Sequence, residues 1–357
     1  MFEEMKKDPA VKLQLASSYA SIANYWKFFD GEAQQLKHNK VYEKKAAEEK
    51  AFAAWAENKE AYKSLLYDID QVYTVYKPYA LQSTYLRECI MAPTIMQLTS
   101  FGIGLDMLYA KKALVLADDK KSKEEKTKAA TEIDSTIAKT CRDYLKALAE
   151  VDYTERIQIA DKKIFAGMLM MYYKNIPSNQ WPAAFTKIAT GIKNGNAEAV
   201  FAKYTDMIFA KSMFASKEKV AAFLSNPVSS KLYKDPAFAY LKSHRDNYNT
   251  NFKSKVDEFQ MQALALGRKY IKGLMEMQPD RVFYPDANST QRLTYGSVKS
   301  YDPKDAIHYD FITTLDGVME KYVPGDYEFD LPSKMLELYK AKDSNRSSKF
   351  SAYFALA

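Results

Sequence analysis

The stretch Arg281-Val-Phe-Tyr-Pro-Asp-Ala-Asn-Ser-Thr-Gln-Arg-Leu-Thr-Tyr-Gly-Ser-Val-Lys-Ser-Tyr301 divides the sequence into two kinds of pattern. Before it, apolar residues recur with the 3.6-residue period of α-helices. Its centre holds four residues that favour turns: Pro285, Asp286, Asn288 and Ser289. Residues 291–301 are then rich in residues that favour β-strands. We therefore expect a helical region up to about residue 279 and strands only after about Arg281.

The composition is that of a globular protein with one large or two ordinary domains. The chain has 357 residues, of which 47% are hydrophobic and 27% charged, with only 11 glycines and 12 prolines to break helices. The net charge is +7, from 52 basic and 45 acidic residues that are interspersed along the chain. Without a basic stripe, this charge favours solvated helix faces and does not indicate a nucleic-acid partner.

The first long helix is expected to begin at Asp8-Pro9, with Asp8 as N-cap and Pro9 at the first helical position. We expect it to end at Asp30-Gly31, because glycine readily adopts the left-handed cap conformation. One apolar stripe runs along it at spacings of three and four: Val11, Leu15, Tyr19, Ile22, Trp26 and Phe29.

Further helices are expected through the rest of this region. Those of residues 32–76 should bury one face, made of Phe52, Trp55, Tyr62 and Leu66. The charged residues 118–128 favour a solvated loop leading into the next helix, over the alternative of a partner-binding tail. The last helix is expected to run unbroken over residues 237–277.

The sequence contains none of the common cofactor or metal motifs, so we expect no cofactor and no metal site. Cys89 and Cys141 lie far apart within helical patterns, which favours two separate buried thiols over a disulfide. His38 and His244 have charged neighbours and are expected at the surface. His308 follows Asp302, but nothing in the sequence pairs it with a serine, so we predict no catalytic residue.

Three segments carry a resemblance to a known family. They are Tyr284-Pro-Asp-Ala-Asn-Ser-Thr-Gln-Arg-Leu-Thr-Tyr-Gly296, Thr313-Thr-Leu-Asp-Gly-Val-Met-Glu-Lys321 and Ser17-Ser-Tyr-Ala-Ser-Ile-Ala-Asn-Tyr-Trp-Lys27. Together they resemble the bacterial dipeptidyl-peptidase 7 and 11 family, over nearly the whole chain. The family consists of serine exopeptidases with a chymotrypsin-like double β-barrel and a large inserted helical domain, which release dipeptides from peptide N-termini.

The resemblance implies a mainly α chain in three parts. Residues 8–279 would form an all-helical cap domain, residues 281–343 the start of an incomplete second β-barrel, and residues 344–357 an atypical C-terminal tail. The family's triad histidine and aspartate would precede this chain, and its serine would follow it. We therefore expect a fragment of such a peptidase, inactive alone, with the determinants of residue preference beyond Ala357.

The same resemblance implies one substrate-binding residue, Asn24 in Asn-Tyr-Trp-Lys27. The family uses an asparagine of its helical domain to hold the free α-amino group of the substrate. An amide oxygen suits this role, because it accepts a charge-assisted hydrogen bond from an ammonium group. The family pattern has another asparagine after the lysine, where this chain has Phe28. The structural alternative is that Asn24 belongs to a polar face at the end of the helix.

The expected partner is the N-terminus of a peptide substrate, and the resemblance also implies a possible homodimer and a periplasmic location. The first eight residues show no signal peptide, and no apolar run is long enough for a membrane span. The competing hypothesis is a free-standing helical binding or scaffold protein without catalysis.

Overall fold

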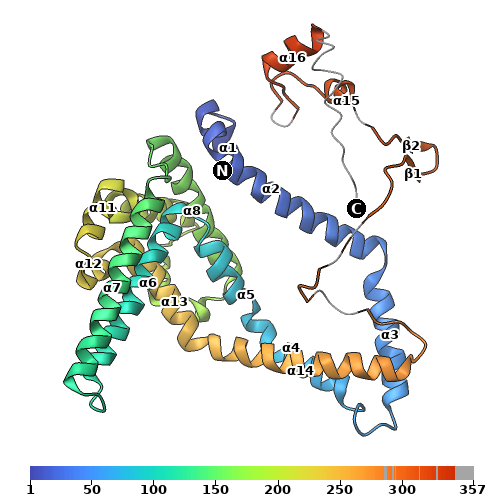
Figure 1. Ribbon diagram of the computed structural model, residues 1–357, viewed down its shortest axis with the longest axis horizontal. Helices are drawn as coiled ribbons and strands as arrows, with labels where there is room; N and C mark the ends of the chain where they lie inside the picture. Colours follow the sequence, from blue (N-terminus) through green and yellow to red (C-terminus); the bar gives the residue numbers. More distant parts are fainter. Residues whose placement is uncertain (285–287, 292, 294, 313, 327–328, 342–357) are drawn as a thin grey trace. The chain divides into compact units, whose positions relative to one another are not determined.

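The computed structural model describes residues 1–284, 288–291, 293, 295–312, 314–326 and 329–341. The chain divides into two compact units, Met1–Arg281 and Val282–Ala357. The first unit is helical throughout, which confirms the prediction of a mainly α fold (Figure 1). The predicted turn residues Pro285 and Asp286 and the tail of residues 344–357 lie outside the described residues.

The helices of the first unit follow one another with short connections. They are α1 (Phe2–Met5), α2 (Pro9–His38), α3 (Val41–Ala56), α4 (Leu65–Tyr76), η1 (Lys77–Tyr79), α5 (Ala80–Thr84), the π-helix η2 (Tyr85–Ile90), α6 (Thr94–Ala117), α7 (Lys123–Leu148), α8 (Glu155–Asn175), η3 (Ser178–Gln180), α9 (Ala183–Ala189), α10 (Ala197–Lys211), η4 (Met213–Ala215), α11 (Lys217–Ser225), α12 (Ser229–Lys234), α13 (Pro236–Asn251) and α14 (Lys253–Met277).

A single large core holds the helices from η2 to α13 together. Its largest fully buried side chains are aromatic: Tyr172, Tyr240, Phe165, Phe185, Phe201, Phe214 and Phe238. Burial of such rings supplies most of the stabilising free energy of a helical bundle, since each removes a large apolar area from water. The charged loop before α7 is as predicted, and Ser122 and Glu125 close it with reciprocal hydrogen bonds that cap the helix.

Helices α3 and α4 both pack on α14, and a smaller aromatic cluster joins α3, the connection that follows it, and α14. Phe52 of α3 lies edge-on to Tyr270 of α14, with 4.9 Å between the ring centroids. Phe52 and Tyr62 are buried as predicted, but the fully buried leucine is Leu65 and not Leu66. Helix α4 begins at Leu65, which is its buried residue.

The long last helix predicted over residues 237–277 is wrong, because two helices form there. Helix α13 ends at Asn251, and Phe252 has φ −125° and ψ −35°, outside the regular helical range. The Phe252 side chain is buried and lies against Tyr79 of η1, with 5.8 Å between the ring centroids. The break therefore lets an apolar side chain enter the core where a straight helix would continue.

The described residues of the second unit form two short strands and two short helices. They are β1 (Tyr301–Lys304), β2 (Ile307–Tyr309), α15 (Leu315–Glu320) and α16 (Ser333–Lys340). The strands pair antiparallel, with Tyr301 opposite Tyr309. Pro332 precedes α16, and Asp316 and Gly317 lie inside α15.

The strand predicted over residues 291–301 is wrong for its described residues, of which only Tyr301 belongs to a strand. Leu293 and Tyr295 are almost fully exposed. Residues that favour strands form one only where a neighbouring strand accepts their hydrogen bonds and a packed face covers their side chains. Of the described residues of this stretch, only Tyr301 pairs with a neighbouring strand, and no packed face covers Leu293 or Tyr295.

Candidate substrate-binding site

The predicted site residue lies on α2, a helix of 30 residues. Asp8 caps it as expected, since its carboxylate accepts a hydrogen bond from the backbone N–H of Ala10 at 2.8 Å. The predicted end at Asp30-Gly31 is wrong, because the helix continues to His38. A glycine inside a helix costs only about 1 kcal/mol. The side chain of Asp30 accepts a hydrogen bond from Gln34 Nε2 at 2.8 Å, one turn further along the same helix.

The apolar stripe of α2 is buried only at its beginning. Val11 is 4% exposed, whereas Ile22, Trp26 and Phe29 are 54%, 63% and 65% exposed. The spacing of these residues predicted one continuous face, and a regular helix does place them on one side. None of the described residues covers the second half of that face.

Asn24 lies in the middle of α2 and not at its end, which removes the alternative of a helix-end position. Each residue of a helix turns by about 100°, so Asn24 points away from Ile22 and Trp26 and shares a face with Phe28. Its side chain is exposed and bonds to none of the described residues. The amide is therefore free to bind a ligand, and its two N–H groups and its carbonyl oxygen are available.

The three histidines do not form a catalytic group with the described residues. His38 is exposed, as predicted. His308 is exposed and its Nδ1 lies 2.7 Å from Asp302 Oδ1, within the β1–β2 hairpin. No serine side chain of the described residues completes this pair into a triad.

The prediction that His244 lies at the surface is wrong, because it is 4% exposed in the bundle core. Its ring lies 4.9 Å from that of Tyr172 and 4.5 Å from that of Tyr240, between centroids. Burial lowers the pKa of His244 from 6.5 to about 3, because the charged form loses its hydration. Its charged neighbours Lys242, Arg245 and Asp246 lie on other sides of α13, because each residue of a helix turns by about 100°.

Both cysteines are buried and free, as predicted. Burial raises the pKa of Cys89 to about 12 and also raises that of Cys141. A thiol is nucleophilic only as the thiolate, so neither residue suits nucleophilic catalysis. The described residues also contain no group of three or more acidic, cysteine or histidine side chains placed to hold a metal ion.

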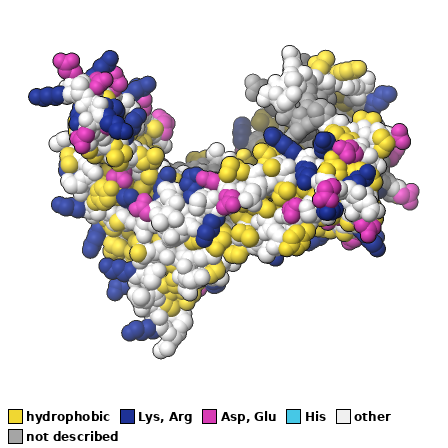
Figure 2. All heavy atoms as spheres, turned by 90° about the horizontal axis from the view of Figure 1, so that it is seen from below, with side chains coloured by type: hydrophobic (Ala, Val, Ile, Leu, Met, Phe, Trp, Pro, Cys, Tyr) yellow, Lys and Arg dark blue, Asp and Glu magenta, His cyan; other side chains and the backbone are white. Residues whose placement is uncertain are grey.

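The surface charges are mixed, as the sequence indicates. Figure 2 shows lysine and arginine side chains scattered over one face, with aspartate and glutamate among them. None of the described helices combines the length and the apolar character that crossing a bilayer requires.

Comparison with known proteins identifies the family. The model of the family described as Peptidase S46 matches residues 1–354. This chain belongs to the Peptidase S46 family. The match covers both units, so the helical unit with its exposed Asn24 and the smaller second unit are parts of one family sequence.

Two relatives of nearly equal similarity bear different names. The Asp/Glu-specific dipeptidyl-peptidase of Flavobacterium psychrophilum is 35% identical over 350 residues, which are 95% of this chain and 44% of the relative. The dipeptidyl-peptidase 7 of Phocaeicola vulgatus is 34% identical over 346 residues, which are 96% of this chain and 44% of the relative. The chain thus spans less than half the length of these relatives.

Solved structures agree with this assignment. The crystal structure of Porphyromonas endodontalis DPP11 in complex with the dipeptide Arg-Glu matches with a TM-score of 0.66 and 25% identity. The match covers 96% of this chain and 45% of DPP11. The complex of the same protein with Arg-Asp matches with a TM-score of 0.64 and the same identity. DPP11, a protein that binds dipeptides, therefore contains the fold of this chain.

Proposed function

We propose that this chain supplies the helical part of a serine-type dipeptidyl-peptidase that releases dipeptides from peptide N-termini. The observation that supports this proposal most directly is the 35% identity, over 95% of the chain, to a relative named as a dipeptidyl-peptidase. Because a relative of the other name is 34% identical, we assign no residue preference to this chain.

We further propose that Asn24 binds the α-ammonium group of the substrate. Its amide is exposed in the middle of a long helix, bonds to none of the described residues, and can accept a hydrogen bond from an ammonium group. In this role Asn24 positions the peptide so that the second peptide bond meets the nucleophile, and it breaks no bond itself. We assign no catalytic residue to the chain.

A chimaera tests this function. Residues 1–354 replace the matching segment of the Flavobacterium psychrophilum relative, and hydrolysis of dipeptidyl substrates is measured. The 357-residue chain alone is expected to hydrolyse none, whereas the chimaera should. A folded chimaera that hydrolyses no dipeptidyl substrate would contradict the proposal.

The role of Asn24 is tested in the same chimaera. Loss of a hydrogen bond to a charged group costs about 1.5–3 kcal/mol, so Asn24→Ala should lower kcat/KM roughly 10- to 150-fold. An N-acetylated substrate lacks the ammonium group, so its kcat/KM should already be low. Asn24→Ala should lower it little further. The control is Asn249→Ala, which removes another exposed asparagine, from the last turn of α13. Equal losses with free and acetylated substrates would show that Asn24 does not bind the ammonium group.

Location and self-association are separate proposals. We propose a periplasmic location and a homodimer for the active peptidase, on the resemblance alone. Fractionation of the source cells and the mass of the purified chimaera by light scattering measure the two independently.

A further inference from the structure

Three polar contacts attach α1, the N-cap of α2 and the first turns of α2 to α8 and to the loop before α8. Lys163 Nζ donates a hydrogen bond to Glu4 Oε1, and Arg156 Nη1 lies 3.4 Å from Asp8 Oδ1. Gln14 Nε2 donates to Asp152 Oδ2. We call these six residues the N-terminal latch. Each contact joins residues more than a hundred positions apart in the chain, so each fixes where α2 lies on the bundle.

The ion pair of Glu4 and Lys163 is the most enclosed part of the latch. The Glu4 side chain is only 12% exposed. The pKa of Glu4 is lowered, mainly by its hydrogen bond with Lys163 and then by that with Lys7, against the opposing effect of burial. Two cations thus stabilise one carboxylate, whose side chain is largely covered, while both lysine side chains are more than half exposed.

The other end of α2 is attached to a different group of helices. It leads through Lys40, which has a left-handed φ of 50°, into α3. Helix α3 packs on α14 through Phe52. Figure 1 shows α2 running from beside α8 to the start of α3. The segment from Ile22 to Phe29, which is exposed except at Ala23, lies between these two attachments, so the attachments determine its position.

The length of α2 gives the distance by which Asn24 would move if the latch opened. Asn24 precedes Lys40 by sixteen residues, a helical length of about 24 Å. If the latch opens and α2 turns about Lys40 by roughly 5°, Asn24 moves by about 2 Å. A misplacement of about 1 Å in a positioning group can cost on the order of 100-fold in rate. A small rotation is therefore sufficient to remove Asn24 from a substrate.

We propose that the N-terminal latch positions Asn24, with Glu4 and Lys163 as its principal positioning residues. The effect on substrate binding rests on the proposed function of Asn24. The effect on the position of α2 does not, and it can be measured in the 357-residue chain by itself.

The first experiment measures the position of α2 directly. Spin labels are attached at Ser21→Cys on α2 and Lys203→Cys on α10, both exposed, while the native cysteines are buried. Lys163→Glu should shift or broaden the distance distribution between the labels by several ångströms. The double variant Glu4→Lys with Lys163→Glu should restore it. Distributions unchanged by Lys163→Glu would overturn the latch, whatever the function of Asn24.

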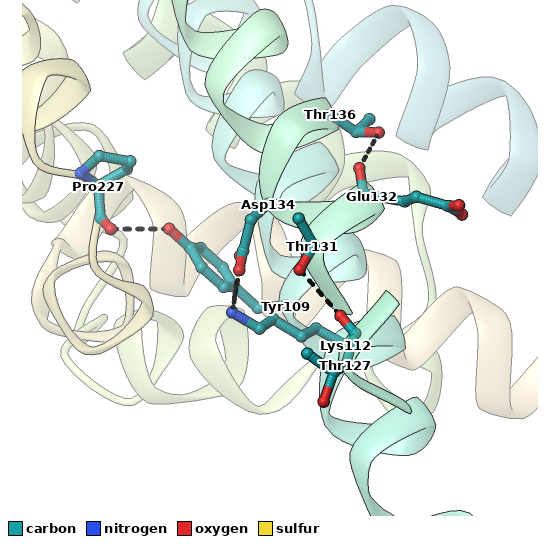
Figure 3. A network of polar contacts seen from close by, with 8 residues as sticks. All are labelled: Tyr109, Lys112, Thr127, Thr131, Glu132, Asp134, Thr136 and Pro227. Carbon is teal, nitrogen blue, oxygen red and sulfur yellow. Dashed lines mark hydrogen bonds and ion pairs between the residues drawn. The ribbon is translucent and has the colours of Figure 1, made fainter. Parts of the chain in front are cut away.

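An ion pair elsewhere in the bundle provides the matched control. Lys112 of α6 and Asp134 of α7 lie 2.6 Å apart from Nζ to Oδ2, beside the hydrogen bond of Tyr109 to Pro227 (Figure 3). Lys112→Glu breaks this ion pair and places two acidic side chains together, and it should leave the label distance unchanged. An equal shift in the control variant would show that any lost ion pair loosens the bundle, and would overturn the specific role of the latch.

The second experiment measures the consequence in the chimaera. Lys163→Glu should raise KM about 10-fold for a substrate with a free N-terminus and should have little effect with the N-acetylated substrate. The charge-swapped double variant should recover most of the loss. A shifted label distance with unchanged kinetics would overturn the positioning role. If Asn24→Ala were also without effect, the proposed function of Asn24 would fail, while the latch itself would stand.

Discussion

Phe52 on α3 lies directly against Gly273 on α14, so that a Cβ atom at position 273 would be 2.7 Å from Phe52 Cε2 and 3.2 Å from Tyr62 Cε1. The close approach of the two helices depends on the missing side chain. Phe52 is fully buried and packs against Tyr62 and against Tyr270 of α14, so its ring has little room to move.

Gly273→Ala should therefore destabilise the protein. Alanine gains about 1 kcal/mol in helix propensity, but forcing a methyl group into a packed site costs about 1–3 kcal/mol. We expect a net loss of about 1 kcal/mol or more in the free energy of unfolding, measured by urea denaturation. Gly267→Ala is the control on the same helix, since nothing lies within 4 Å of a Cβ at that position. It should be neutral or stabilising by up to about 1 kcal/mol, and a stabilising Gly273→Ala would contradict the packing argument.

The buried His244 predicts a loss of stability in acid. Its pKa is about 3 in the folded chain and about 6.5 in the unfolded chain, so only the unfolded chain binds the proton between these values. Stability should fall by about 1.4 kcal/mol for each pH unit below about 6, and level off near pH 3.

The variant His244→Phe isolates this effect from the titration of carboxylates, which both proteins share. The difference in unfolding free energy between the two proteins, measured from pH 7 to pH 4, should change in favour of the variant as the pH falls. A difference that does not vary with pH would show that His244 is not buried in its neutral form.

Asp235 is expected to be the most sensitive of the helix caps. Its buried carboxylate accepts hydrogen bonds from the N–H groups of Ala237 and Phe238 at the start of α13, and from Met213 N at 2.7 Å and Ser212 Oγ at 2.9 Å. Asp235→Ala leaves several buried donors without an acceptor, each costing about 1–3 kcal/mol. We expect a loss of roughly 3 kcal/mol or more in chemical denaturation.

An ordinary cap provides the comparison for Asp235. Ser216 accepts only the N–H of Lys219 at 3.3 Å, at the start of α11. Ser216→Ala should cost about 1 kcal/mol. Equal costs for the two variants would mean that the additional contacts of Asp235 contribute nothing.

The two buried thiols should be unreactive in the folded protein. At pH 8 a thiol-specific chromogenic reagent should modify neither Cys89 nor Cys141, because both are buried and their pKa values are raised. Both should react when the chain is unfolded in guanidinium chloride. The variant Ser21→Cys, with its thiol on the exposed side of α2, should react at once in the folded state. Fast reaction of the native protein would disprove burial.

Local patterns predicted the elements whose cause is local. The cap at Asp8, the loop before α7 and the buried thiols follow from spacing and side-chain chemistry within a few residues. The end of α2 and the break at Phe252 did not follow, because tertiary packing decides them. His244 was misassigned for the same reason, since charged neighbours in sequence lie on another side of a helix.

The candidate site likewise has one part that the sequence indicated and one part that only the packing of the helices revealed. A resemblance led to Asn24, and its exposure in the structure agrees with a role in binding. The N-terminal latch had no signal in the sequence, because a lysine and a glutamate that are 159 residues apart carry no mark of their pairing. Such contacts appear only once the helices are placed.

The free amide of Asn24 also has a meaning for how this family can diverge. Because the side chain contributes nothing to the packing of α2, a substitution at this position changes the chemistry offered to a substrate at almost no cost in folding. Many functional positions carry a conflict between activity and stability. If Asn24 binds the substrate as proposed, position 24 is free of that conflict, and a substitution there would alter substrate binding without altering the fold.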